Sequence, residues 1–268
     1  VHFSNAYHGS SMGALSVLGS EYFKSNYRPL VPDARELRYG EIEDLEQISC
    51  RTAAVIMETI QAESGVTPPS KAYMKALRER CDYVGALLIL DEIQAGMGRS
   101  GSLWAFEQFG IKPDILLTAK ALGGGMPLGA FIAPKSIMQN LIENPILGHI
   151  TTFGGHPVSC AAGMAALEFI REKALYAQVK PKEALFRKLL VHPKILRFKS
   201  FGFLMSIEFP DFETNSKVIE ACMRKGIITD WFLFADNCLR ISPPLIITEE
   251  EIRKSCSLIL EAIDEALA

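Results

Sequence analysis

The chain has 268 residues, of which 49% are hydrophobic, which is enough for a large core and two domains and excludes a disordered or fibrous protein. The formal net charge is -3 and the basic residues are scattered among acidic ones, so the sequence lacks the basic patch of a nucleic-acid-binding protein. The sequence contains no uninterrupted run of about 18 apolar residues and no signal-peptide pattern. We therefore expect a cytoplasmic protein with neither a nucleic acid nor a membrane as partner.

The six cysteines lie far apart in mostly apolar surroundings and form no C-x-x-C pair, which is typical of reduced thiols in the cytosol. The five histidines form no i, i+4 pair and no cluster with cysteine. A zinc site would need ligands from distant segments, and we expect no metal.

The first half of the chain has the pattern of a parallel sheet covered by helices. Its opening residues, VHFSNAYHG (1–9), look like the middle of a strand, so an N-terminal segment is expected to be missing. Short runs rich in Val, Ile and Leu then recur between helical patterns such as 69–84. These expected strands are 52–59, 86–93, 114–121 and 129–134.

After the glycine-rich TTFGGHP (151–157), the pattern changes. Residues 158–179 have apolar side chains at helical spacing and predict one long helix. Isolated strands are expected at 202–209 and 238–247, mixed with helices, which favours a smaller α+β domain.

A C-terminal helix is expected from Thr248 onward, because Thr248 and Glu251 form a capping box ahead of apolar positions at helical spacing. The predicted organisation is a large α/β domain at 1–157 and a small α+β domain at 158–268.

Three glycines, Gly96, Gly98 and Gly101, form a G-x-G-x-x-G pattern after the expected strand 86–93. In a dinucleotide-binding fold the first glycine follows the strand almost at once and an acid lies about 20 residues further on. Here four residues separate Asp91 from Gly96, and no acid stands at the expected distance. A nicotinamide-dependent dehydrogenase therefore stays only as an alternative.

Asp91 and Lys120 lie at the ends of two neighbouring expected strands. Taken alone, Asp91 could be a helix cap and Lys120 a surface lysine. Burial would lower the pKa of a lysine and make its amine nucleophilic enough to form a Schiff base, and the glycines at 123–125 would let the backbone bend around a planar ligand. Together the pair suits pyridoxal phosphate, whose aldehyde binds lysine and whose pyridine nitrogen needs a carboxylate.

Six motifs carry a resemblance to the class III aminotransferases of fold type I, the ornithine and acetylornithine type, over nearly the whole chain. They are AYHG (6–9), METIQAESGV (57–66), LILDEIQAGMGRSG (88–101), AKALGGGMPLGA (119–130), TTFGGHPVSCAA (151–162) and LRISPPLIIT (239–248). The resemblance implies a mostly parallel, helix-flanked large domain that binds pyridoxal phosphate.

The resemblance also implies roles for the cofactor site. Lys120 is similar to the Schiff-base lysine, which also moves the proton at the substrate Cα as general base and acid. Asp91 would pair with the pyridinium nitrogen, and Gln94 would bind the phenolic oxygen of the ring. Tyr7 resembles the aromatic residue that stacks on the ring, with His8 beside it in the cofactor site.

For the substrate, Arg240 resembles the arginine that grips a carboxylate in a two-pronged manner, and Glu63 the acid that pairs with it and releases it. Glu58 would support the site from behind. Thr152 is similar to a threonine that reaches the cofactor phosphate of a partner subunit, which implies a homodimer with shared active sites. A surface ion pair for Glu63 and Arg240, and a plain turn residue for Thr152, are the simpler alternatives.

Three positions depart from the family pattern. Ser10 replaces an arginine that many glutamate-using relatives have after HG, and Thr59 and Ala62 replace a proline and a glycine. The phosphate-binding glycine-rich loop of relatives lies upstream of Val1. The Ser10 departure weakens the expectation of a dicarboxylate acceptor.

The expected function is amino-group transfer from an ω-amine or amino-acid donor, with N-acetylornithine or ornithine expected, to a 2-oxo acid, with 2-oxoglutarate expected. An aminomutase of the glutamate-1-semialdehyde kind keeps the same fold and cofactor. A catalytically silent interaction fragment is the alternative from another class.

Overall fold

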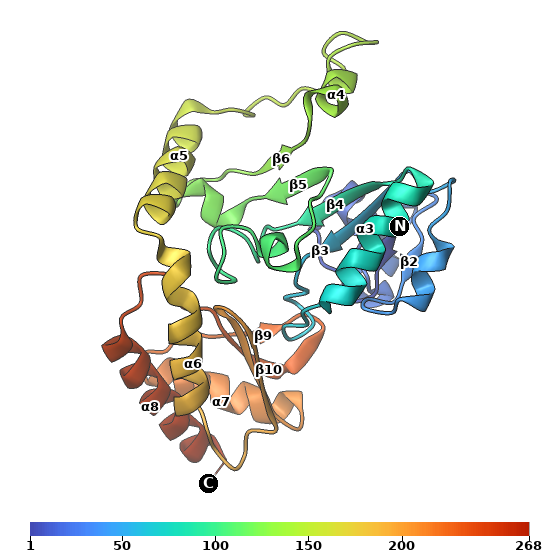
Figure 1. Cartoon of the computed structure of the whole chain (residues 1–268). Helices are drawn as coiled ribbons and strands as arrows, with labels where there is room; N and C mark the ends of the chain where they lie inside the picture. The colour runs from blue at the N-terminus through green and yellow to red at the C-terminus, as the bar shows by residue number, and fades with distance from the viewer. Residues whose placement is uncertain (268) are drawn as a thin grey trace.

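The computed structural model describes residues 1–267, and its strands form a mostly parallel sheet in the first half and an antiparallel sheet in the second (Figure 1). The first sheet has the order β3-β4-β5-β6, in which β3, β4 and β5 are parallel and β6 is an antiparallel edge strand. Its strands are β3 (Ala54–Glu58), β4 (Leu87–Asp91), β5 (Ile115–Thr118) and β6 (Ala130–Ile132). The predicted α/β fold with a parallel-dominated sheet is confirmed.

Helix α3 (Lys71–Val84) connects β3 to β4 and covers one face of the sheet. It begins where the Ser70 hydroxyl accepts a hydrogen bond from the Tyr73 backbone N–H, and it ends at Gly85, whose φ of 78° is left-handed. Its buried side chains pack with those of β3 and β4. This core includes Val55, Met57, Tyr73, Met74, Leu77, Cys81, Leu88 and Leu90.

The first residue lies beside β3, whereas His2–Phe3 pairs in parallel with Glu36–Leu37 in a separate two-stranded sheet. The Val1 amine donates to the Ala54 carbonyl (2.8 Å), and the Ile56 N–H donates to the Val1 carbonyl (3.0 Å). The regular strand here is only two residues long. The remaining elements of this region are β1 (His2–Phe3), α1 (Met12–Ser16), α2 (Glu21–Lys24) and β2 (Glu36–Leu37).

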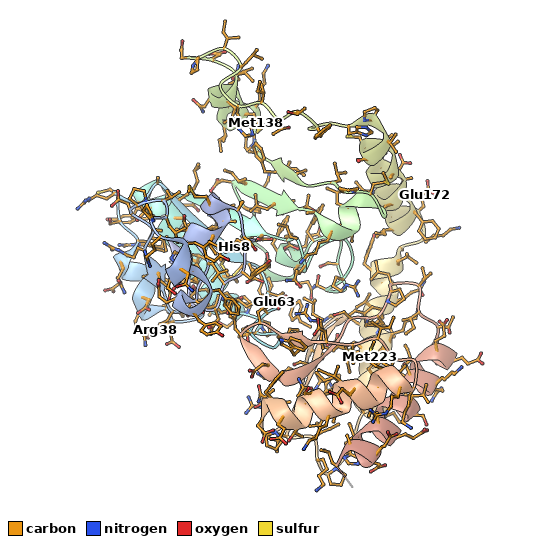
Figure 2. All side chains as sticks on the ribbon, turned by 180° about the vertical axis from the view of Figure 1, so that it is seen from behind. His8, Arg38, Glu63, Met138, Glu172 and Met223 are labelled. Atoms are coloured by element: carbon orange, nitrogen blue, oxygen red, sulfur yellow. The ribbon has the colours of Figure 1, made fainter. Side chains whose placement is uncertain are left out.

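A segment containing α4 (Lys135–Met138) projects away from the sheet before the chain returns to α5 (Pro157–Glu172). Seen from behind in Figure 2, Met138 lies on this projecting segment, whereas His8 and Glu63 lie in the middle of the molecule.

The prediction of one helix over 158–179 is wrong. Helix α5 ends at Glu172, Ala174 adopts a left-handed φ of 44°, and a 3-10 turn leads into α6 (Val179–Leu189). The two helices pack on different partners, since α5 contacts the 3-10 turn η4 (Lys120–Gly123) and α6 contacts α8 (Glu249–Ala266). Apolar spacing continues through the break because both helices bury a face, so the sequence pattern cannot reveal the break.

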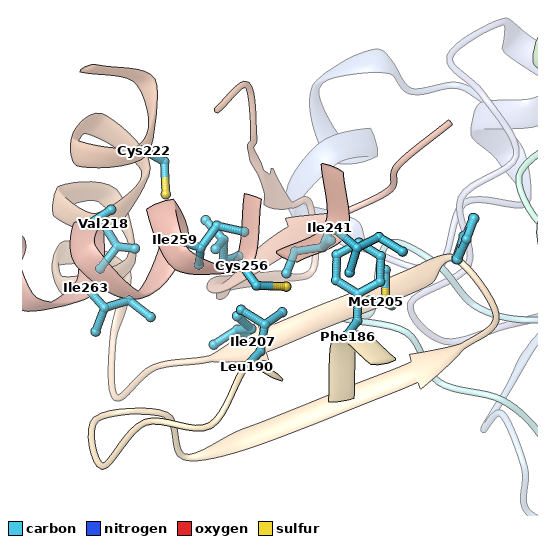
Figure 3. Close-up of a cluster of buried hydrophobic side chains, with 14 of the residues drawn as sticks. Phe186, Leu190, Met205, Ile207, Val218, Cys222, Ile241, Cys256, Ile259 and Ile263 are labelled. Carbon is cyan, nitrogen blue, oxygen red and sulfur yellow. The ribbon is translucent and has the colours of Figure 1, made fainter. Parts of the chain in front are cut away.

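The second sheet is antiparallel with the order β7-β8-β10-β9 and carries helices α6, α7 and α8. The elements not yet given are β7 (Arg197–Phe201), β8 (Leu204–Glu208), α7 (Phe212–Arg224), β9 (Trp231–Phe232) and β10 (Ala235–Ile241). Figure 3 shows the core between sheet and helices, where Phe186, Ile207, Val218 and Ile259 are buried. This core does not include β3, β4 or β5.

Of two predicted element boundaries in this region, the end of a strand is wrong and the start of a helix is confirmed. The strand expected at 238–247 ends at Ile241, because Pro243 and Pro244 cannot donate to a ladder. The capping box of α8 is present, with the Glu251 N–H donating to the Thr248 hydroxyl (3.2 Å) and the Thr248 N–H to the Glu251 carboxylate (2.7 Å).

The division into 1–157 and 158–268 stays a prediction. Helix α5 lies on the small-domain side of that division but packs on η4, and the core of the second sheet begins at Val179. Within residues 1–267, every helix is too short or too polar to cross a membrane.

Candidate active site

A cavity of about 260 Å³ opens at the carboxyl ends of β3, β4 and β5. The register explains why acidic and basic side chains meet there, because Glu58 lies opposite Asp91 and Asp91 lies opposite Leu117 of β5. Ligands of open parallel sheets bind outside this edge. The cavity is lined by Tyr7, His8, Gly9, Glu58, Ile60, Asp91, Ile93, Gln94, Ala95, Ala119 and Lys120.

Asp91 is buried at the end of β4 with both carboxylate oxygens engaged. One oxygen lies 2.8 Å from His8 Nδ1, and the other accepts the Ile93 backbone N–H at 2.9 Å. The other ring nitrogen of His8, Nε2, is buried without a partner among residues 1–267. These two contacts fix the orientation of a carboxylate that lines the cavity.

Lys120 begins η4 directly after β5 and has a left-handed φ of 49°. Such a conformation costs a non-glycine residue roughly 1–3 kcal/mol and is found mostly where the surrounding structure imposes it. Burial lowers the pKa of the Lys120 amine below its ordinary value, although nearby carboxylates act in the opposite direction. The amine is therefore easier to deprotonate than that of a surface lysine.

The three glycines after Lys120 do not line the cavity. Gly124 has a φ of 57°, and a Cβ atom there would lie 2.6 Å from the Ala162 carbonyl oxygen on α5. The structure thus gives this glycine a packing role, the close approach of η4 to α5, instead of the expected bend around a ligand.

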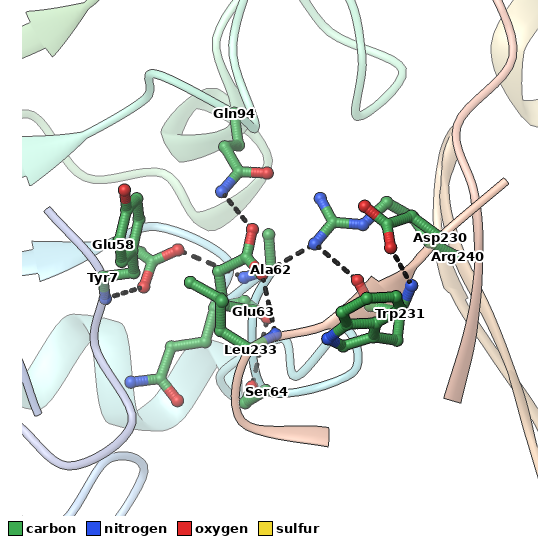
Figure 4. A network of polar contacts seen from close by, with 11 residues as sticks. Tyr7, Glu58, Ala62, Glu63, Ser64, Gln94, Asp230, Trp231, Leu233 and Arg240 are labelled. Atoms are coloured by element: carbon green, nitrogen blue, oxygen red, sulfur yellow. Dashed lines mark hydrogen bonds and ion pairs between the residues drawn. The ribbon is translucent and has the colours of Figure 1, made fainter. Parts of the chain in front are cut away.

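Glu58 connects three parts of the site (Figure 4). It accepts the Tyr7 backbone N–H at 2.9 Å and the Ala62 backbone N–H at 3.2 Å. Burial raises the pKa of its carboxyl to about 8, with the nearby Asp91 acting in the same direction. Glu58 thereby fixes the segment that carries Tyr7 and the loop that carries Glu63.

Glu63 and Arg240 form an ion pair between the two halves of the chain, with 2.6 Å between the Arg240 guanidinium and the Glu63 carboxylate (Figure 4). Gln94 donates to the other carboxylate oxygen at 2.9 Å, and the Leu233 backbone N–H donates at 3.1 Å. Burial alone would raise the pKa of Glu63, but Arg240 and the other donors lower it below its ordinary value. Glu63 is almost fully buried, so this is not a surface ion pair.

Thr152 and Ser10 are exposed and lie outside the cavity. The other expected residues come together: Tyr7, His8, Glu58, Asp91, Gln94 and Lys120 line the cavity, and Glu63 contacts it through Gln94. The expected role of Thr152 toward a partner subunit stays a prediction.

Sequence reasoning missed Glu92, which is buried beside Asp91 and faces away from the cavity. It accepts the Thr59 hydroxyl (2.7 Å) and two backbone N–H groups at the start of the 105–109 turn. Burial raises the pKa of Glu92 to about 7. The sequence feature that could have revealed it is the acidic pair Asp91-Glu92 at a strand end. Successive side chains of a strand point to opposite faces of the sheet, so only one of the two acids can face the cavity.

The glycine pattern at 96–101 is not a dinucleotide loop, because turns follow β4 where that fold needs a helix. A Cβ atom at Gly96 would lie 2.8 Å from the Trp104 ring, and one at Gly98 would lie 3.0 Å from Leu245. Gly96 thus allows close packing within the first half of the chain, and Gly98 allows close packing between the two halves. No group of three or more His, Cys, Asp or Glu side chains within residues 1–267 has metal-binding geometry.

Comparisons with known proteins agree with this geometry. The sequence model of the family described as aminotransferase class III matches residues 1–263. The ornithine aminotransferase of Toxoplasma gondii ME49 is similar with a TM-score of 0.91 and 30% identity, over 98% of this chain and 64% of that protein. A Bacillus anthracis aminotransferase has a TM-score of 0.90 and 27% identity, with 98% and 69% covered. A transaminase from the marine bacterium Virgibacillus has a TM-score of 0.89 and 26% identity, with 99% and 67% covered.

This chain therefore spans slightly less than two thirds of the Toxoplasma enzyme, another structure of which has pyridoxal phosphate at partial occupancy in its active site. The family match covers nearly every residue, and the carboxylate and lysine expected from the motifs line one cavity. The chain belongs to the class III aminotransferases, a family of pyridoxal-phosphate-dependent enzymes.

Proposed function

We propose that this protein transfers an amino group from an ω-amine or amino-acid donor, best N-acetylornithine or ornithine, to a 2-oxo acid, best 2-oxoglutarate. The observation that carries the proposal is that Asp91, at the end of β4, and Lys120, just after the adjacent parallel strand β5, line the same cavity. A lysine amine and a carboxylate in one cavity are the pair that a pyridoxal ring requires.

The cavity residues fit pyridoxal phosphate. Asp91, whose carboxylate is fixed by two hydrogen bonds, would pair with the pyridinium nitrogen, and Tyr7 would offer an aromatic side chain to the ring. Gln94, which lines the cavity, would bind the phenolic oxygen of the ring. When bound, the cofactor supplies an electron sink that makes the substrate Cα acidic.

Lys120 is the acid and base of the proposed reaction. Its amine would hold the cofactor before substrate arrives and, once released, would take the proton from the substrate Cα. Arg240 grips a substrate carboxylate once its pair with Glu63 opens, whereas a donor without a carboxylate at that end leaves the pair closed. One site can thus accept both an ω-amine and a dicarboxylate.

We also propose that the functional unit is a homodimer whose partner supplies Thr152 to the cofactor phosphate. Among residues 1–267, Lys120 is the only lysine or arginine that lines the cavity, which favours a partner subunit that supplies further donors to the phosphate.

The test is a half-reaction experiment on the purified protein loaded with pyridoxal phosphate. Ornithine or N-acetylornithine is expected to bleach the visible band of the bound cofactor, and 2-oxoglutarate is expected to restore it. Borohydride followed by peptide mass spectrometry is expected to locate the cofactor on Lys120. Lys120→Ala should lose this adduct and slow the bleaching roughly 10²- to 10⁴-fold.

Other outcomes support the alternatives. An aminomutase would turn over its substrate without a separate oxo acid. A silent interaction fragment would give neither a visible band nor a Lys120 adduct.

A further inference from the structure

The guanidinium group of Arg240 lies over an aromatic ring. Its guanidinium carbon lies 4.4 Å from the centre of the Phe232 ring, within the range of a cation-π contact. Phe232 is 1% exposed, whereas a quarter of the Arg240 side chain is exposed. The ring is thus a fixed surface, and the charged group on it remains accessible to a ligand.

Glu63 is held in place even without Arg240. Its carboxylate accepts Gln94 Nε2 and the Leu233 backbone N–H, and its carbonyl accepts the Phe234 backbone N–H at 3.0 Å. If the ion pair opens, the arginine is therefore the partner that moves.

The hairpin that contains Phe232 also fixes the backbone of Arg240. The Arg240 backbone N–H donates to the Asp230 carbonyl at 2.8 Å, and its side chain reaches the Trp231 carbonyl at 3.3 Å. Arg240 Nε is buried and has no hydrogen-bond partner among residues 1–267. A guanidinium group lying on a ring can turn within its own plane, exchange Glu63 for another carboxylate and still keep the contact with the ring.

We propose that Phe232 is a positioning residue for carboxylate recognition, a platform on which Arg240 turns from Glu63 to a substrate carboxylate. This inference rests on the proposed role of Arg240. Phe232 keeps the arginine in the site while the ion pair is open, so its loss should weaken carboxylate binding through Arg240 and by no other route.

The test measures binding of glutarate, an unreactive dicarboxylate, to the cofactor-loaded protein by calorimetry in a double-mutant cycle. Phe232→Leu is expected to raise the Kd for glutarate roughly three- to thirty-fold, the range of a partly desolvated cation-π contact. In an Arg240→Met background the same substitution is expected to change the Kd less than twofold. Phe209→Leu, which removes an equally buried phenylalanine from the core of the second sheet, is the matched control with wild-type affinity.

Equal weakening in both backgrounds would show a general structural effect and overturn the inference, as would an unchanged Kd in Phe232→Leu. If Arg240→Met itself binds glutarate like the wild type, the proposed role of Arg240 fails and this inference with it. If Phe232→Leu does not fold, Phe232→Met fills a similar volume and gives the same comparison.

Discussion

Lys120 shows how single residues at this site are held in conformations that they would not adopt alone. Its left-handed backbone directs the side chain into the cavity, and the same region has further non-glycine residues with positive φ, Val66 (65°) and Met97 (54°). A β-branched residue such as Val66 rarely adopts this conformation. The packing of the surrounding loops maintains these strained backbone conformations and offsets their unfavourable free energy.

The buried glutamates give the protein a pH-dependent stability. The carboxyls of Glu58 and Glu92 have pKa values of about 8 and about 7 in the folded chain, against an ordinary value of 4.5. Each therefore binds its proton more tightly when folded, so its contribution to stability is complete below about pH 4.5 and is lost as the pH rises through the folded pKa. We expect the free energy of unfolding to fall between pH 5 and 8 by a few kcal/mol, since one pKa unit is about 1.4 kcal/mol.

Denaturant unfolding at several pH values checks this prediction. Glu58→Gln should be less stable than the wild type at pH 5, because the glutamine N–H₂ group would face the backbone N–H of Tyr7 or Ala62. Its free energy of unfolding should nevertheless decline less steeply with pH, because glutamine does not titrate. Glu250→Gln, at an exposed carboxyl, should keep the wild-type slope. A free energy of unfolding of the wild type that rises between pH 5 and 8 would contradict the raised pKa values of Glu58 and Glu92.

At the scale of elements, the contact between η4 and α5 determines where Lys120 lies. A Cβ atom at Gly163 of α5 would lie 2.6 Å from the Leu128 side chain and 2.8 Å from the Leu122 carbonyl oxygen. Only glycine lets the helix approach the turn that begins with Lys120 this closely.

Gly163→Ala is therefore expected to lower the free energy of unfolding by roughly 1–3 kcal/mol, the usual cost of overpacking. A loss of stability would be informative, because helix propensity alone would make the alanine variant more stable by about 1 kcal/mol. Gly13→Ala in α1, with no atom within 4 Å of the added Cβ, is the matched control and should be neutral or stabilising. Denaturant unfolding of both variants measures the difference, and a stabilised Gly163→Ala would refute the packing argument.

At the scale of the whole molecule, the projecting segment exposes large apolar side chains. Four of them are at least two-thirds exposed, namely Ile146 (84%), Leu147 (68%), Ile150 (70%) and Phe153 (81%). Monomeric proteins rarely expose such a group together, and the proposed homodimer would bury it.

Two neighbouring substitutions separate assembly from cofactor binding. Phe153→Asp is expected to shift sedimentation velocity toward the monomer, because it puts a charge into the proposed interface. Thr152→Val is expected to stay dimeric but to bind pyridoxal phosphate roughly ten- to hundred-fold more weakly, the value of a hydrogen bond to a charged group. Cofactor affinity unchanged in Thr152→Val would argue against sharing of the site between subunits.

The sequence alone determined those features that depend on local pattern. Apolar runs located β3, β4 and β5, the Thr248 capping box located the start of α8, and the motifs located Asp91 and Lys120. Parallel strands bring their carboxyl ends to one edge, so the meeting of these two residues followed from chain order alone.

Only the tertiary structure decided the break at Ala174, the fixed Glu63 held by the second half of the chain, and the Phe232 ring under Arg240. The first two depend on contacts between residues far apart in the sequence, and the third depends on the pairing of two strands in a hairpin. The apolar period continues unchanged through Ala174. Phe232 looks like any core phenylalanine in the sequence, and only the folded hairpin brings its ring under the Arg240 guanidinium. Local pattern records which side chains are buried, and the three-dimensional fold determines what they are buried against.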